Sequence, residues 1–142
     1  MLEALIAILI FSMGILAIIG LQAAAVKNAG DAKYRSDASL LVNQLVGQML
    51  VSNRSSLANL QANFSGNISG VADGPSYTAW ASGVAVALPG VTVANGTMPT
   101  VNIAQATRTS GSAPSNQATI TVRWQAPNET TSHSYTAIAQ IR

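Results

Sequence analysis

The most apolar part of the chain is its N-terminal segment. Between Ala4 and Leu21 there is no charged residue and one polar side chain, that of Ser12, and the apolar run continues with a single interruption to Val26. As a helix, this run would be about 35 Å long, which exceeds the roughly 30 Å of a bilayer's hydrocarbon core. Because the segment offers no polar face to water, the pattern predicts a membrane-spanning helix over residues 1–26.

A cleavable secretory signal is the main alternative for this segment. Ala23, Ala24 and Ala25 have the small side chains of a cleavage site. A secretory signal, however, begins with positive charge and has an apolar stretch of about 7 to 15 residues. Here the first basic residue is Lys27, and Glu3 is the only charge before it. These features favour a retained helix, whereas the alternative predicts a mature chain that begins at Val26.

An amphipathic pattern follows the apolar segment. Apolar residues recur at helical spacing on one face, at Ala38, Leu41, Val42, Leu45 and Met49. Opposite charges lie four residues apart in three pairs, Lys27 with Asp31, Asp31 with Arg35, and Lys33 with Asp37. Since Gly66 and Gly70 are the first strong stop signals, we expect one continuous helix from the apolar segment to about residue 63.

The pattern of the remaining sequence is typical of a small antiparallel sheet. Apolar and polar residues alternate clearly from Ala118 to Trp124, which predicts a strand with one buried face. We expect strands at Gly83–Leu88, Val91–Val93, Pro99–Arg108, Gln117–Gln125 and Ser134–Ile141. Turn signals separate these runs, at Pro89-Gly90, Asn95-Gly96, Ser110-Gly111 and Pro127-Asn128. The sequence therefore predicts an α+β fold, in which the amphipathic half of the helix packs on a sheet over about residues 78–142.

The composition excludes most kinds of catalytic site. Only 8% of the residues are charged, there is no Cys, and there is one His. These counts exclude disulfide scaffolds, zinc fingers, thiol catalysis and His-based relays. Seven Lys and Arg over 142 residues form no basic stripe, so no specific nucleic acid is predicted as a partner. We expect a protein without enzymatic activity, cofactor or metal.

The few residues that are able to carry chemistry do not combine into a site. We interpret Trp80 and Trp124 as core residues, His133 as an exposed loop residue, and Asp73 and Glu129 as turn residues without an acid–base role. Arg108 and Arg123 could contact DNA or a partner subunit, but two arginines do not define a surface.

The N-terminal block reads Met1-Leu-Glu-Ala-Leu-Ile-Ala-Ile-Leu-Ile-Phe-Ser-Met-Gly-Ile-Leu-Ala-Ile-Ile-Gly-Leu-Gln22. This block resembles that of type IV pilins, and within them the PilV group of minor pilins. Two shorter segments, Leu88-Pro-Gly90 and Thr119-Ile-Thr-Val-Arg-Trp-Gln125, are similar to that group's Leu-Pro-Gly turn and Val-x-Trp strand. The resemblance implies the pilin fold, in which residues 1–26 form the transmembrane and filament-core half of the helix and residues 27–142 form a periplasmic head.

Four residues of the apolar helix are candidates for roles in assembly, and the role of Glu3 is the one that the resemblance implies. Glu3 would pair with the N-terminal amine of a neighbouring subunit and fix axial register. Gly14 and Gly20 would loosen the helix locally, and Gly20 with Ala24 would form a small-xxx-small pair for close helix approach. The family's Glu is the fifth mature residue, so we expect that a leader and two mature residues precede Met1, and the prepilin peptidase is a partner if that leader exists.

As a minor pilin, the chain would be a structural subunit that helps prime pilus assembly and supports adhesion or twitching motility. Its implied partners are other minor pilins, the major pilin, the inner-membrane assembly platform and inner-membrane lipid. Its implied location is the bacterial inner membrane, with the head outside the cytoplasm, and the cell-surface pilus. Two alternatives remain: a minor pseudopilin of a type II secretion system, and a secreted adhesin or binding module whose signal sequence is cleaved.

Overall fold

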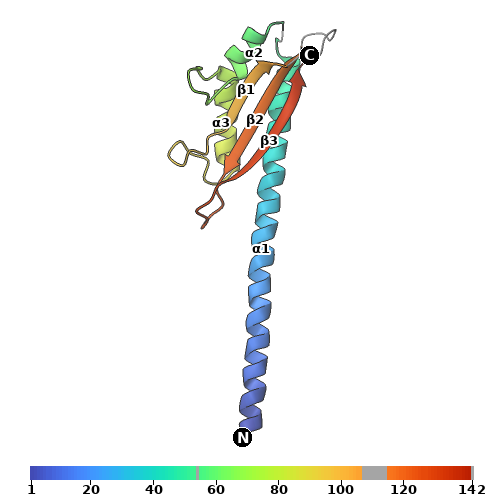
Figure 1. The fold of residues 1–142 in the computed structure, drawn as a ribbon, viewed down its shortest axis with the longest axis vertical. Coiled ribbons are helices and arrows are strands. Elements are labelled where there is room, and N and C mark those ends of the chain that lie inside the picture. The colour runs from blue at the N-terminus through green and yellow to red at the C-terminus, as the bar shows by residue number, and fades with distance from the viewer. Residues whose placement is uncertain (54, 107–114, 142) are drawn as a thin grey trace. The chain divides into compact units, whose positions relative to one another are not determined.

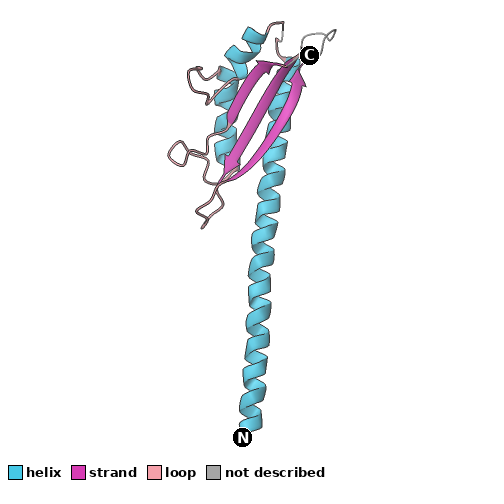
Figure 2. Ribbon diagram, viewed as in Figure 1, coloured by secondary structure: helices cyan, strands magenta, loops and turns pink. Residues whose placement is uncertain are grey.

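The computed structural model describes residues 1–53, 55–106 and 115–141. The fold is α+β, with a long N-terminal helix and a small three-stranded antiparallel sheet (Figures 1 and 2). In chain order the elements are α1 (Leu2–Val51), α2 (Leu57–Phe64), α3 (Pro75–Ala87), β1 (Thr100–Gln105), β2 (Asn116–Trp124) and β3 (His133–Ile141). The chain divides into two compact units, Met1–Tyr34 and Arg35–Arg142, which we call the N-terminal unit and the globular unit.

The N-terminal unit is the apolar part of α1. All its large apolar side chains from Leu2 to Val26 are exposed, and Ser12 Oγ donates a hydrogen bond to the carbonyl of Ile8, which satisfies the one hydroxyl of the apolar run. Among the described residues, α1 is the one helix that is long and apolar enough to cross a membrane, and none of its most apolar stretch is buried within the chain. The predicted apolar helix is therefore present, and its surface is uncovered.

In the globular unit, α1 buries the predicted stripe. Ala38, Val42, Leu45 and Met49 are each at most 1% exposed, while Leu40 on another face is 69% exposed. The carbonyl of Leu41 accepts a hydrogen bond of 2.9 Å from Trp80 Nε1, which joins α1 to α3. The spacing of apolar residues thus correctly identified which side of α1 enters the core.

The expectation of one helix to about residue 63 is wrong, because α1 ends at Val51. Ser52 Oγ donates to the carbonyl of Met49 (2.8 Å), and the Asn53 side chain accepts from the backbone N–H of Ser55 (3.1 Å). Ser and Asn side chains compete in this way with helical backbone hydrogen bonds. Ser56 then caps α2 by accepting from the N–H of Asn59 (3.2 Å), so that a new helix starts at Leu57.

The expected strand at Gly83–Leu88 is also wrong, because most of it belongs to α3. Pro75 stands at the start of this helix, where its missing N–H costs nothing. Buried side chains follow at Tyr77, Trp80, Ala81 and Val84, which is the spacing of one helical face. The β-branched and small residues of this segment favour a strand only weakly, and burial of two aromatic rings on one face decides for the helix.

The expected strand at Val91–Val93 is replaced by a loop. Gly90 and Gly96 adopt left-handed backbone, with φ of 68° and 64°. The hydroxyl of Thr97 is buried, donates to the carbonyl of Gly90 (2.6 Å) and accepts from the N–H of Thr92 (2.9 Å). The Thr97 hydroxyl therefore satisfies backbone groups of the loop that would otherwise pair with a neighbouring strand. The sheet begins at Thr100 rather than near residue 78.

The sheet has the order β1-β2-β3, and both pairings are antiparallel. The central strand alternates as predicted, with four buried side chains, those of Ala118, Ile120, Val122 and Trp124. Gln61 Nε2 on α2 donates to the carbonyl of Ile103 on β1 (2.7 Å), which attaches α2 to the sheet. The strand expected at Pro99–Arg108 corresponds to β1, and its predicted end at Arg108 and the predicted turn at Ser110-Gly111 lie outside the described residues.

Candidate functional site

The first candidate site is the start of α1, where a carboxylate precedes the apolar surface. Glu3 lies in the first helical turn and is exposed. An acidic group at this position is stabilised by the partial positive charge of the helix N-terminus. Beyond Glu3 the next charged residue is Lys27, so this carboxylate is the one charged side chain on an otherwise apolar helical surface. The predicted pairing of Glu3 with a neighbouring amine remains a prediction.

The small residues of the apolar helix have free space around them within the chain. A Cβ atom added at Gly14 or Gly20 would meet no heavy atom within 4 Å, and Ala24 is exposed. The backbone is α-helical through both glycines, so neither breaks α1. Packing within the chain therefore does not require glycine at these positions, and their predicted roles in flexibility and close helix approach stay predictions.

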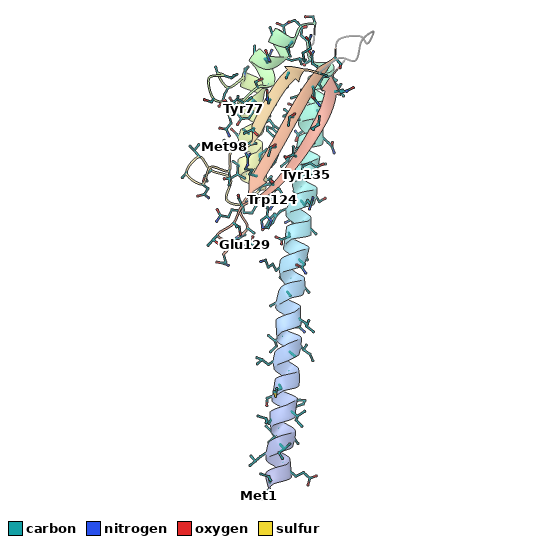
Figure 3. All side chains as sticks on the ribbon, viewed as in Figure 1. Met1, Tyr77, Met98, Trp124, Glu129 and Tyr135 are labelled. Carbon is teal, nitrogen blue, oxygen red and sulfur yellow. The ribbon has the colours of Figure 1, made fainter. Side chains whose placement is uncertain are left out.

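A second group of side chains gathers where β2 ends and β3 begins (Figure 3). His133 is the first residue of β3, and its Nε2 lies 2.6 Å from Oε2 of Glu129. The imidazole stacks on the indole of Trp124, with ring centroids 5.9 Å apart and planes 17° from parallel. The interpretation of His133 as an exposed loop residue is therefore wrong. His133 is half-buried at the start of β3 and contacts Glu129 and Trp124.

Sequence reasoning missed this group because its members are brought together by the turn between the strands. Asn128 has a left-handed φ of 66°, and the N–H of Glu129 donates to the carbonyl of Ala126 (3.1 Å), which closes a tight turn with Pro127 and Asn128 at its centre. The register then places Trp124 directly opposite His133. The one available signal was the Pro-Asn turn between two alternating segments, which predicts a hairpin and hence the pairing of the residues that flank it.

The two tryptophans are core residues, as predicted. Trp80 and Trp124 are 5% and 3% exposed. Trp80 uses its N–H to bind α1, whereas the Nε1 of Trp124 is buried without a hydrogen-bond partner among the described residues. The rings therefore stabilise the globular unit and present no stacking surface to a ligand.

Asp73 and Tyr77 are structural as well. Asp73 Oδ1 accepts a hydrogen bond from the N–H of Asn67 (2.7 Å), which has a left-handed φ of 53°. The buried hydroxyl of Tyr77 donates to the carbonyl of Pro99 (2.7 Å). Burial, with a smaller effect from the Asp73 charge, raises the pKa of Tyr77 to about 12, so this phenol stays protonated at physiological pH.

The two short segments that carry the later part of the resemblance touch in the structure. The N–H of Gln125 donates to the carbonyl of Pro89 (3.0 Å), and a Cβ atom on Gly90 would lie 2.8 Å from that of Gln125. The Leu-Pro-Gly turn is therefore held against the residue that follows the Val-x-Trp strand, and a glycine is needed at their contact.

Comparisons with protein-family models, curated proteins and solved structures find no match to this chain.

Proposed function

We propose that this chain is a structural subunit without enzymatic activity, a PilV-type minor pilin of a type IV pilus. The observation that carries the proposal is the division of α1 by environment. Its first 26 residues leave every large apolar side chain exposed, whereas residues 38–49 bury one stripe in a folded globular unit. An apolar surface of this extent needs lipid or other helices around it, which an anchored filament subunit has at every stage.

The free energy of assembly follows from that exposed surface. In the membrane, lipid covers the apolar segment of α1, and in a filament the equivalent segments of neighbouring subunits would cover it. Because lipid and apolar side chains are similarly hydrophobic, the transfer costs little, and close packing at small residues such as Gly20 and Ala24 favours the filament. The subunit would therefore leave the inner membrane without exposing its apolar surface to water.

Glu3 would supply the register of the assembly. A carboxylate surrounded by apolar helices is costly unless an opposite charge and hydrogen-bond donors meet it. The N-terminal amine of a neighbouring subunit is such a group, and one axial position of the two helices brings them together. Other positions leave the carboxylate unpaired in an apolar environment, so the pair selects the correct position.

The location and partners of the protein follow from this proposal. The N-terminal unit would anchor it in the bacterial inner membrane, with the globular unit outside the cytoplasm, until it joins the pilus at the cell surface. Its partners would be the major pilin, other minor pilins and the inner-membrane assembly platform. As a minor subunit it would prime assembly and support adhesion or twitching motility.

The decisive experiment is quantitative proteomics of sheared surface pili from cells that express the tagged protein. We expect the chain in the pilus fraction at low stoichiometry, and a deletion strain with fewer surface pili. Normal piliation in the deletion strain would contradict a priming role, and a loss of protein secretion with intact pili would assign the chain to a type II secretion system. N-terminal sequencing of the mature protein addresses the remaining alternative, because a chain that begins at Val26 has lost the anchor.

A further inference from the structure

The two outer strands of the sheet differ in how their free edges are protected. On β1, the N–H of Gly66 donates to the carbonyl of Val101 (3.2 Å) and the N–H of Val101 donates back to the carbonyl of Gly66 (3.1 Å), so a short bridge covers the start of that edge. Further along the strand, the carbonyl of Ile103 accepts from Gln61 Nε2 (2.7 Å). A Cβ atom at Gly66 would overlap the ring of Tyr77, which shows how closely the covering segment is packed. The edge of β1 is therefore blocked to another strand.

The outer edge of β3 has none of these protections. β3 is nine residues long, pairs with β2 without a bulge, and has no described strand on its other side. From Ser134 to Ile141 it contains no proline and no charged residue. Natural proteins usually protect an exposed edge with lysine, proline, a bulge or a short strand, because its unpaired N–H and C=O groups accept a further strand. On β3, those groups are open to main-chain pairing with another strand.

The side chains of β3 leave room for an added strand on both faces. Tyr135, Ala137 and Ala139 share the face of the core, yet they are only half-buried, and two of the three are small. On the other face, Ile138 is 63% exposed. A partner strand with larger apolar side chains at alternate positions would extend the core next to Ala137 and Ala139, since alternate residues of a strand share one face.

Charge then distinguishes a foreign strand from a second copy. Arg123 lies on β2 directly opposite Ser134 of β3, and it makes no ion pair among the described residues. Neighbouring strands are about 4.8 Å apart, so an extended arginine and an acidic side chain together reach across the small Ser134 to a strand added at β3. None of the three strands of this chain contains an acidic residue. A second copy's strands therefore offer nothing to Arg123.

We propose that β3 is the docking edge for an extended strand of a different protein, which adds to the sheet by main-chain hydrogen bonds. That strand carries apolar side chains on the face of Ala137 and Ala139 and an acidic side chain that meets Arg123 beyond Ser134. Backbone pairing would supply most of the affinity, and the acidic side chain would supply selectivity. This inference does not depend on the proposed pilus function.

The probe for this edge is a synthetic peptide of alternating residues, Glu-Val-Thr-Val-Thr-Val-Thr-Val-Glu, with acetyl and amide ends and a fluorophore. With a glutamate at each end, the peptide places an acid near Ser134 whether it binds parallel or antiparallel to β3. The matched control peptide has glutamine at both ends. Binding to the full-length protein in detergent micelles is measured by fluorescence anisotropy. We expect wild type to prefer the glutamate peptide by about two- to fivefold, the range of exposed ion pairs. In Arg123→Gln the preference should disappear, while the affinity for the glutamine peptide stays unchanged.

Hydrogen–deuterium exchange on the same samples locates the bound peptide. We expect slower exchange of backbone amides in β3 and unchanged exchange in β1. Equal binding of the two peptides by wild type, or no protection of β3, would overturn the proposal. Protection of β3 that rises with protein concentration in the absence of peptide would overturn it too, because a second copy would then occupy the edge. Since no pilus is involved, these results are independent of the localisation experiment above.

Discussion

At the scale of single residues, the structure depends on a few positions where backbone geometry or close contact admits one residue type. Gly90 is one of them, because its φ of 68° and its contact with Gln125 both exclude a side chain. Gly66 is another, because the Tyr77 ring fills the space of a Cβ atom. By contrast, Gly83 on α3 has free space around it. The Pro89-Gly90 turn signal indicates the first of these positions in the sequence, whereas nothing local indicates that Gly66 meets Tyr77.

We therefore predict opposite effects for two alanine substitutions. Gly90→Ala should lower the free energy of unfolding by about 2–3 kcal/mol, because it combines backbone strain with a clash at Gln125. Gly83→Ala, in an exposed helical position, should raise it by up to about 1 kcal/mol. Urea denaturation of the full-length protein in detergent measures both. Equal stabilities of the two variants would contradict the role assigned to the Pro89-Gly90 contact.

Tyr77 makes stability depend on alkaline pH. Its folded-state pKa is about 12, and the unfolded value is 10.0, so the unfolded chain loses this proton first as the pH rises. The stabilisation that the buried phenol provides is complete below pH 10 and is lost as the pH approaches 12, and the difference corresponds to roughly 2–3 kcal/mol.

Tyr77→Phe separates this effect from other titrations. The variant should be less stable at neutral pH by about 1 kcal/mol, because the hydrogen bond to Pro99 is lost. Between pH 10 and 12 its stability should fall less steeply than that of the wild type. Thermal or urea unfolding across this pH range tests the prediction, and parallel curves for the two proteins would refute it.

At the scale of elements, α1 serves two environments with one continuous backbone. The side chains of its apolar segment are exposed, whereas Val42, Leu45 and Met49 are buried completely or nearly so. Most helical stability in proteins comes from packing of a buried face, which the second part has within the chain and the first part does not. The end of α1 is set locally by Ser52 and Asn53, whose side chains bind nearby backbone groups.

Two leucines of α1 provide a matched test of the buried stripe. Leu45→Ala should destabilise the globular unit by about 2–5 kcal/mol, because it leaves a cavity in the core. Leu40→Ala, at a site that is 69% exposed, should change stability by less than about 1 kcal/mol. The measurement is the midpoint of urea denaturation followed by tryptophan fluorescence, and a similar loss for both variants would mean that the stripe has been assigned to the wrong face.

At the scale of the whole molecule, the protein combines a folded unit with an apolar segment that the chain itself does not cover. None of the side chains between Leu2 and Val26 is buried. Among the described residues, the buried apolar side chains all belong to the globular unit. In the proposed function, lipid or other helices cover the N-terminal unit. If the chain is the proposed pilus subunit, mutations in the two units should be separable, one class affecting folding and the other affecting membrane insertion and assembly.

Glu3→Gln tests this separation. The variant should unfold like the wild type, because Glu3 is exposed and its carboxylate stabilises no buried group. Under the proposed function, its incorporation into surface pili should fall on the order of tenfold or more, since the N-terminal amine of the neighbouring subunit would lose its charged partner. Quantification of the tagged subunit in sheared pili and in the inner membrane gives the ratio, and Gln22→Glu serves as a control that restores the charge at the wrong axial position. Normal incorporation of Glu3→Gln would exclude the pairing.

The sequence-based expectations were accurate for features that depend on a pattern within one element, and inaccurate for features that depend on turns or on contacts between segments. The apolar helix, the buried stripe from Ala38 to Met49 and the alternation in β2 were confirmed, because each is a repeating pattern within one element. The strands expected at 83–88 and 91–93 were wrong, since a short apolar run suits more than one structure. Contacts with distant residues such as Leu41 decided the first, and hydrogen bonds of Thr97 with Gly90 and Thr92 decided the second. The pairing of His133 with Glu129 and Trp124 was missed because a turn, and not sequence periodicity, brings these residues together.

The sequence by itself determined that its N-terminal part is an apolar helix with Glu3 as its one charged residue before Lys27, that an amphipathic helix follows, and that a sheet with one polar face comes after it. Hydrophobic periodicity encodes these features residue by residue. Only the tertiary structure decided that α3 is a helix, that Gly66 covers the edge of β1, and that the edge of β3 stays open. These features depend on which distant segments meet, and free energies of packing and of backbone pairing between such segments are not written in any local pattern.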